Sequence, residues 1–393
     1  MPSPLTISLP ERLDLKGAIG FGNTLSEQSA ATVALFDCSA LAFVEPFGML
    51  YAAQVIQQLK ARTGCQIAPI NHDRATSADY AAHMGFFKAC GFPLGKKPGQ
   101  APGSTRYLPI TFQSVEALRM SQTYRADVQR IGETIANQLL QKASGSLLTA
   151  VAYAIREVVR NVIEHSEADQ FGYCAQYWPS QNEVEIAIID AGIGLTASLR
   201  RNPLLSGLAN DRDALKLALH PGSSSKTYRG SPAQEGVQNF GFGLYMLYRL
   251  CGLGGSFFLG SGSAGLFHDA RDASHGYHAL AIGGTVLSLR FNGGLLKNFD
   301  NQWETFVAEG NIEAEKVLGG TVASSERLSM MLRGEFALLK RAFAVGDQVR
   351  HERYGVGQIQ DVLPSPQGEM LHVQFGTRSE KVAAHTVQLL DTI

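Results

Sequence analysis

The sequence predicts an α/β protein of several domains with a small β-barrel at its C-terminal end. Strand and helix signals alternate along most of the chain, which is typical of α/β folds. After residue 342 the pattern changes to short strands separated by turns that contain glycine and proline, as expected of a small β unit. At about 150 residues per domain, the length of 393 residues favours two or three domains.

The first 94 residues are predicted to form a small α/β unit. Strands are expected near residues 6–9, 32–36 and 65–70, and helices at 47–61 and 78–90. Residues 95–105 (GKKPGQAPGST) show no periodicity and are rich in glycine, proline and lysine. We therefore predict a linker at 95–105.

Residues 106–300 are predicted to form the central α/β domain. Strands are expected at 106–112, 172–178 and 183–190, with two more ending at 291, and helices at 115–142, 146–165 and 245–250. Residues 196–239 are irregular and rich in glycine, serine and proline, which predicts a long mobile loop, and such loops are usually functional. Residues 301–342 are expected to form a helical connector, and residues 343–393 the barrel.

Composition excludes several classes of protein. Hydrophobic residues make up 45% of the chain, which excludes wholesale disorder. The formal net charge of -1 provides no basic field of the kind that attracts nucleic acid. Because no signal peptide and no run of roughly 18 apolar residues is found, no membrane association is expected. Five cysteines without a CxxC pair indicate free buried thiols in a reducing compartment, so we expect a cytoplasmic protein.

Three segments suggest a functional site, and the first lies on the helix that ends at His165. Glu157, Asn161 and His165 are four residues apart, so they lie along one face of this helix. A carboxylate and an amide one turn apart can bind a hydrated cation and orient a water molecule. Alone, this pattern is a weak signal, and a solvated polar face is the more common explanation.

The second segment follows the strand at 183–190. Alternate aliphatic residues of this strand share a face with Asp190, so its carboxylate ends a buried apolar row and needs a donor, such as the amino group of adenine. Gly192 and Gly194 allow the backbone to turn and to approach a ligand closely. An ordinary turn after a strand is the alternative interpretation.

The third segment consists of glycines that lead into a helix. Gly241 and Gly243 precede Leu244, where the free N–H groups of a helix start can bind phosphate oxygens. The alternative is a glycine turn that only begins the helix. A Rossmann-type site is not indicated, because an irregular loop rather than a strand precedes these glycines.

The order and spacing of these segments resemble the GHKL ATPase superfamily, which includes gyrase, heat-shock chaperone, histidine kinase and MutL. Glu157 and Asn161 resemble its N-box. The segments 190–194 and 241–244 resemble its first and second glycine boxes, and Gly284–Thr285 is similar to its last glycine–threonine strand. The resemblance covers residues 140–295 and implies the family's left-handed (Bergerat) α/β sandwich, with one mixed sheet backed by helices.

The resemblance implies ATP and Mg²⁺ as ligands. Asn161 would hold the Mg²⁺ that bridges the phosphates, and Glu157 would be the general base for an attacking water or would orient a hydroxyl nucleophile. Asp190 would accept a hydrogen bond from the adenine amino group, and Thr285 would support that contact through water. The backbone contacts would come from Gly192 and Gly194 at the base and from Gly241 and Gly243 at the phosphates.

The resemblance also implies that residues 196–239 form a lid over the nucleotide. Lys226 in this lid would contact the γ-phosphate, and a solvated lysine is the alternative. The E-x-x-x-N-x-x-E-H pattern that ends at His165 resembles most closely the anti-sigma-factor kinase and histidine kinase branch. The helix at 115–142 contains no histidine, which argues against self-phosphorylation on histidine.

The N-terminal unit resembles a STAS domain, the fold of anti-sigma-factor antagonists. Residues 35–48 (LFDCSALAFVEPFG) match its strand–turn–helix pattern. Regulated members carry a phosphorylatable serine at the start of this helix, where Pro46 stands here. We therefore expect a structural or partner-docking unit rather than a phosphorylation switch, with Ser39 as the remaining alternative acceptor.

The segment 346–357 (GDQVRHERYGVG) resembles the Tudor-like barrel that ends UvrD-type helicases. Residues 343–393 carry four Lys and Arg against six Asp and Glu, so nucleic-acid binding is disfavoured and protein docking is expected. The resulting hypothesis is a Mg-ATP-binding regulatory ATPase whose lid controls partner binding. A serine/threonine kinase acting on a separate STAS partner and an ATP sensor without turnover are the alternatives. Dimerisation and the partner's identity stay open.

Overall fold

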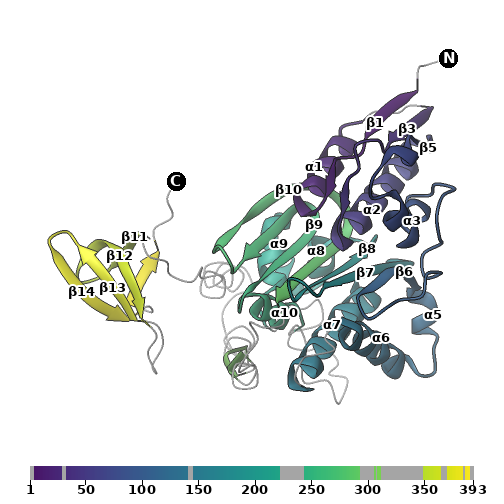
Figure 1. Ribbon diagram of the computed structural model, residues 1–393. Helices are drawn as coiled ribbons and strands as arrows, with labels where there is room; N and C mark the ends of the chain where they lie inside the picture. The colour runs from purple at the N-terminus through teal and green to yellow at the C-terminus, as the bar shows by residue number, and fades with distance from the viewer. Residues whose placement is uncertain are drawn as a thin grey trace. The chain divides into compact units, whose positions relative to one another are not determined.

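The computed structural model describes residues 4–28, 32–139, 145–221, 243–292, 305–306, 308–310, 348–363, 370–383 and 386–389. The chain forms two compact units, Met1–Glu335 and Phe336–Ile393, whose helices and strands are traced in Figure 1. The prediction of an α/β protein of several domains is confirmed. In the described part of the chain, no helix is long and apolar enough to cross a membrane.

The N-terminal part of the first unit is a parallel sheet with helices beside it. Strands β1 (Leu5–Ser8), β3 (Val33–Asp37) and β5 (Gln66–Ile70) pair in this order, and the short strands β2 (Arg12–Leu13) and β4 (Phe43–Val44) form a second parallel pair. The helices are α1 (Leu15–Ser26), α2 (Pro46–Thr63), η1 (His72–Arg74), α3 (Ala78–His83) and α4 (Phe86–Ala89). The predicted alternation of strands and helices is confirmed.

Two helices in this part differ from the prediction. The sequence predicts no helix at α1, because its three glycines lower helix propensity. The helix forms because the Asp14 side chain caps it, accepting a hydrogen bond from the Gly17 N–H at 2.9 Å, and because its apolar face packs into the core. The single helix expected at 78–90 is interrupted, since Gly85 adopts a left-handed φ of 87° between α3 and α4.

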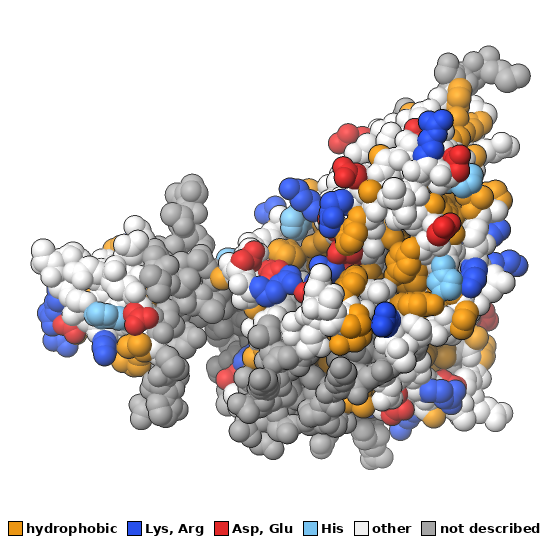
Figure 2. Space-filling model, viewed as in Figure 1, with side chains coloured by type: hydrophobic (Ala, Val, Ile, Leu, Met, Phe, Trp, Pro, Cys, Tyr) orange, Lys and Arg blue, Asp and Glu red, His pale blue; other side chains and the backbone are white. Residues whose placement is uncertain are grey.

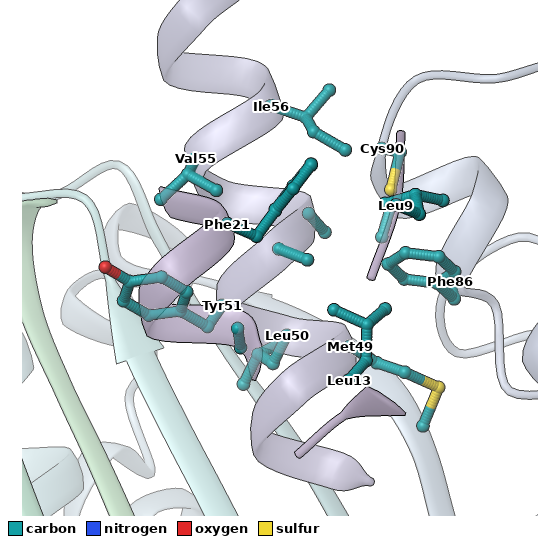
Figure 3. Packing of buried hydrophobic residues seen from close by; sticks show 14 of the residues in the cluster. Leu9, Leu13, Phe21, Met49, Leu50, Tyr51, Val55, Ile56, Phe86 and Cys90 are labelled. Carbon is teal, nitrogen blue, oxygen red and sulfur yellow. The ribbon is translucent and has the colours of Figure 1, made fainter. Parts of the chain in front are cut away.

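The hydrophobic core of this part continues into the central sheet. Figure 3 shows Phe21 of α1 beside Val55 and Ile56 of α2. The same cluster contains residues from the strands that follow, including Ile110 and Phe258. The segment expected to be a linker at 95–105 also contacts the strand that follows it, because the Gly99 N–H donates to the Ile110 carbonyl at 2.8 Å. The domain boundary between residues 94 and 106 stays a prediction.

The central sheet contains five strands in the order β6-β7-β8-β10-β9, and each neighbouring pair is antiparallel. The strands are β6 (Tyr107–Ser114), β7 (Gln170–Trp178), β8 (Glu183–Asp190), β9 (Gly255–Asp269) and β10 (Ser274–Asn292). Helices α5 (Val115–Arg119), α6 (Tyr124–Leu139) and α7 (Gly145–His165) come between β6 and β7, and α10 (Gly243–Cys251) precedes β9. The single helix expected at 115–142 is broken, because the hydroxyls of Ser121 and Thr123 donate to Asp127 and begin α6.

The two faces of the sheet have different partners. In β8, Ala187 and Ile189 point toward α1 and α2 and belong to the N-terminal core, whereas Ile188 and Asp190 point to the other face and line a pocket. This separation follows from the two-residue period of a strand. The sheet is therefore buried on one face by the N-terminal helices, while α7 lies across the pocket on the other (Figure 1).

A buried ion cluster joins α2 to the sheet. An Arg290 guanidinium nitrogen lies 2.6 Å from a Glu45 carboxylate oxygen and 2.9 Å from a Glu185 oxygen. The Phe47 N–H, at the start of α2, donates to the second Glu185 oxygen at 3.0 Å. Burial raises the pKa of Glu185 to about 7, and the charge of Arg290 opposes this shift. The Glu185 carboxylate of the sheet therefore accepts a hydrogen bond from one of the N–H groups at the start of α2, which have no partner within the helix.

The prediction of an irregular loop at 196–239 is wrong for residues 196–221. Residues 196–221 contain most of α8 (Gly194–Leu199), with η2 (Pro203–Leu205) and α9 (Asp211–Ala218) after it. The leucines of this stretch form a small core of their own, and Asp211 anchors α9 to β9 by accepting hydrogen bonds from the N–H and hydroxyl of Ser263. Residues 222–242, with Lys226 and Gly241, lie outside the described residues, as does nearly all of the predicted connector at 301–342.

The second unit is an antiparallel sheet in the order β14-β13-β12-β11-β15. Its strands are β11 (Gln348–His351), β12 (Gly355–Leu363), β13 (Met370–Phe375), β14 (Arg378–Ala383) and β15 (Val387–Leu389). Val349, Ile359 and Val373 are among the residues of its core. In the described residues of this unit, no pairing joins β14 to β15, so closure into a barrel stays a prediction. All five cysteines of the chain are free and buried, as predicted.

Candidate functional site

A pocket of about 100 Å³ lies between α7 and the central sheet. Most of its wall is aliphatic, from Val158, Val162, Ile188, Leu195, Leu199, Ala218, Leu244, Leu259 and Leu287. Its polar side chains are those of Asn161, His165, Ser166, Asp190, Ser198 and Thr285, and Gly194 contributes backbone. An apolar slot with a few polar groups is the usual form of a site for a planar organic ligand.

The structure brings together five of the ten predicted site residues. Asn161, Asp190, Gly194, Leu244 and Thr285 all line this pocket, although they come from α7, β8, α8, α10 and β10. Within the described lining, neither Glu157 nor Gly192 nor Gly243 is present. The positions of Lys226 and Gly241 are not described.

Asp190 is the buried acid of the pocket, with only 4% of its surface exposed. It ends β8 and lies directly opposite Thr285 of β10 in the sheet register. The Gly192 N–H donates to its carboxylate at 2.8 Å, and Thr285 donates through its N–H and its hydroxyl. Burial raises the pKa of Asp190 to about 6, against the effect of these donors. The group is thus an acceptor in the pocket that changes protonation state in mildly acidic solution.

The glycines beside Asp190 are required by close backbone approaches. A Cβ atom at Gly192 would lie 2.0 Å from the carbonyl oxygen of Ser166, which also accepts from the Ile193 N–H at 2.8 Å. Gly192 therefore allows the turn after β8 to pack against the end of α7, and its contact with a base stays a prediction. Gly284 has a φ of 89°, and a Cβ there would lie 2.0 Å from the Asp190 carbonyl oxygen.

Glu157 is 2% exposed and is held by two arginines. A nitrogen of Arg156 lies 3.0 Å from one carboxylate oxygen, and a nitrogen of Arg160 lies 2.9 Å from the other. Gly243, the first residue of α10, packs against Glu157, because a Cβ at this position would lie 2.5 Å from the Glu157 Cβ. These guanidinium groups occupy acceptor sites on both carboxylate oxygens, which a general base would offer to water.

Asn161 lines the pocket from α7 and contributes a side-chain amide. An amide oxygen is one of the ligands that Mg²⁺ accepts. Mg²⁺ usually takes few ligands from the protein and completes its coordination shell with phosphate oxygens and water. Among the residues that the structure describes, no group of three or more His, Cys, Asp and Glu side chains that could hold a metal ion is found.

Several pocket residues carry no local signal in the sequence. Ser198 lies in a stretch expected to be irregular, and Ser166 is a single serine after the predicted helix. Ser261, on β9, touches the two turns that flank Asp190 without lining the pocket. Only the placement of His165, on the polar face with Asn161, follows from the helical spacing.

Comparison with known proteins adds no family assignment. A scan against protein-family models finds none that matches the chain, and a search of curated proteins finds no matching protein. The pocket's residues are therefore the basis for inferring function. They offer a buried acceptor, aliphatic walls and an amide, which suit an organic ligand with a hydrogen-bond donor.

Proposed function

We propose that this chain binds ATP with Mg²⁺ in the pocket between α7 and the central sheet and acts as a regulatory ATPase. The observation that carries the proposal is Asp190, a buried acceptor at a largely aliphatic slot. The amino group of adenine would donate to this carboxylate, and the aliphatic walls would bury the faces of the ring. The resemblance of the surrounding motifs to the GHKL superfamily supports the same ligand.

The phosphates would extend from the base toward Asn161 and the start of α10. Asn161 would be the protein ligand of a Mg²⁺ ion that bridges the phosphates. Leu244 lines the pocket and Gly243 begins α10, whose first N–H groups would bind phosphate oxygens. Gly241 and Lys226 belong to this proposal as further phosphate contacts, by resemblance alone.

Hydrolysis would use Glu157 as the general base for the attacking water. Because Arg156 and Arg160 pair with both of its oxygens, release of one guanidinium during turnover would expose Glu157 to the attacking water. A guanidinium released in this way could pair with the phosphate charge. The same ion pairs favour a second candidate function, an ATP sensor without turnover, in which Glu157 only holds α7 and its arginines in place.

The other parts of the chain are proposed to carry protein partners. The parallel order β1-β3-β5 with α1 and α2 supports a STAS-like fold for the N-terminal part, and the five-stranded second unit supports a Tudor-like barrel. Pro46 and Phe47 are buried against the sheet, which disfavours phosphorylation at the start of α2. In Figure 2 the visible face shows basic and acidic side chains interspersed, which disfavours nucleic acid as the partner. We place the protein in the cytoplasm.

The test is to incubate the purified chain with γ-labelled ATP and Mg²⁺ and to follow the label. Release of labelled phosphate that Glu157→Ala abolishes would support the ATPase. Binding in calorimetry with no release would favour the sensor, and label retained on the protein or on an added STAS protein would indicate a kinase. Absence of ATP binding in calorimetry would refute the proposal altogether.

A further inference from the structure

Ser261 connects the two turns that flank Asp190. It lies on β9 and is 2% exposed. Its hydroxyl donates to the Gly284 carbonyl oxygen at 2.9 Å and accepts from the Leu195 N–H, also at 2.9 Å. The Ser261 hydroxyl therefore acts as donor to one segment of the chain and as acceptor from another, and so links the two.

The position of Ser261 in the sheet follows from the strand register. Ser261 pairs with Thr285 across β9 and β10, and Thr285 pairs with Asp190 across β10 and β8. These three residues thus form one row across three strands. The pairing of β9 with β10 is irregular on one side of this row, with register shifts between residues 279 and 285. The ladder of backbone hydrogen bonds is disrupted at such shifts, and the bond from the Ser261 hydroxyl to the Gly284 carbonyl adds a connection beside them.

Ser261 also caps α8. The residue before this helix, Ile193, has no side-chain capping bond. The Leu195 N–H is one of the first four N–H groups of the helix, which have no partner within the helix. The hydroxyl of Ser261 supplies this partner from another strand, as an N-cap side chain does locally.

We propose that Ser261 is the positioning residue of this pocket, because its hydroxyl fixes the separation between the Gly194–Leu195 turn and the Gly284–Thr285 turn. Both turns contribute lining residues to the pocket, namely Gly194, Leu195 and Thr285. Ser261 thereby sets the width of the slot at Asp190 and the approach of Thr285 to the carboxylate. This inference rests on the proposed ATP binding, since it assigns a role at the same site.

The proposal has a consequence for pH dependence. Hydrogen bonds from Thr285 hold down the pKa of Asp190 against the effect of burial. When the Gly284–Thr285 turn is released, these bonds weaken and the pKa of Asp190 rises further. ATP binding through an ionised Asp190 is then lost at a higher pH than in the wild-type protein. Of the described residues that line the pocket, His165 on α7 is the other titratable one, and the change leaves it in place.

The experiment measures ATP affinity by calorimetry from pH 5 to pH 8 for the full chain and its variants. Ser261→Ala is expected to reduce affinity roughly tenfold at pH 7.5, as loss of one or two hydrogen bonds would. It is also expected to move the midpoint of the pH profile upward by about half a unit. Ser261→Thr keeps a hydroxyl and should restore both quantities. The control is Ser288→Ala, a buried serine that pairs with Ala187 on the opposite face of the sheet.

Each outcome is decisive. A Ser261→Ala protein with the wild-type affinity and pH midpoint, while the wild type binds ATP, overturns the role of Ser261 and leaves the proposed function intact. Equal losses in Ser261→Ala and Ser288→Ala also overturn it. If Ser261→Ala does not fold, Ser261→Cys, with a weaker donor and acceptor, replaces it; it must bind ATP more weakly than the wild type with a higher pH midpoint, and wild-type values overturn the role of Ser261. A wild type that binds no ATP refutes the proposed function, and this inference fails with it.

Discussion

Replacing Asp190 with Asn should stabilise the fold and weaken ATP binding at once. The pKa of Asp190 is raised from 3.8 to about 6 in the folded protein, because the charged form is buried. Between these pH values the folded state binds more protons than the unfolded state, so stability falls as pH rises. Above pH 6 the ionised carboxylate costs about 3 kcal/mol, because each pKa unit of the rise from 3.8 to about 6 is worth about 1.36 kcal/mol.

The amide side chain introduced by Asp190→Asn avoids this cost but provides one acceptor fewer. Its oxygen can accept from the Gly192 N–H, and its NH₂ group then meets the donors of Thr285, at a cost of about 1 kcal/mol. The net gain at pH 7.5 is about 2 kcal/mol. For a unit spanning Met1–Glu335 this corresponds to a rise in melting temperature of about 3 °C. At pH 4 the gain should vanish.

The measurement combines thermal melting at the two pH values with calorimetry of ATP. We expect a melting temperature above that of the wild type at pH 7.5 and not at pH 4, together with at least a tenfold loss of ATP affinity. Rotation of the amide cannot recover binding, because it only changes which donor lacks an acceptor. A variant that melts below the wild type at pH 7.5 would refute the burial argument, and unchanged ATP affinity would refute the adenine assignment.

Three further predictions concern other parts of the first unit. Asn161→Ala should weaken Mg-ATP more than Mg-free ATP in calorimetry, and equal losses would remove Asn161 from the metal. Arg290→Met should destabilise the protein by about 3–5 kcal/mol by leaving buried carboxylates unpaired. Because the folded-state pKa of Glu185 is raised to about 7, this loss should be larger at pH 8.5 than at pH 5.5 in thermal melts, and a pH-independent loss would contradict the ion cluster. Gly284→Ala should destabilise by about 1–3 kcal/mol through its left-handed φ, whereas Gly276→Ala, where a Cβ meets nothing within 4 Å, serves as the control and should not.

Regular periodicity predicted the elements that build the pocket. The strand expected at 183–190 is β8 with the same bounds, and the helix expected at 146–165 is α7. Both have strong patterns, because β8 is buried on both faces and α7 has one apolar side. This is why Asn161 and Asp190, placed by those two elements, lie at one pocket.

The features that sequence reasoning missed depend on contacts between distant segments. α1 contains glycines that local propensity disfavours, and it forms because its apolar face packs against α2. α9 lies in a stretch that reads as irregular, and its anchor is Asp211 bonded to Ser263 on β9. Ser261 carries no local signal, because its function as a cap and bridge exists only after β9 lies beside β10. The ion pairs of Glu157 with Arg156 and Arg160 also could not be predicted from the sequence, and they are compatible with a structural role as well as with a general base.

The most direct test of the central claim compares ATP with GTP on the unmodified chain. Guanine carries a carbonyl oxygen where adenine carries the amino group, so in the same pose it would place an acceptor against the ionised Asp190. Calorimetry in the presence of Mg²⁺ at pH 7.5 should show one ATP per chain and at least tenfold weaker binding of GTP. Equal affinity for the two nucleotides, or no binding of ATP, would contradict the assignment of Asp190 as the acceptor for adenine.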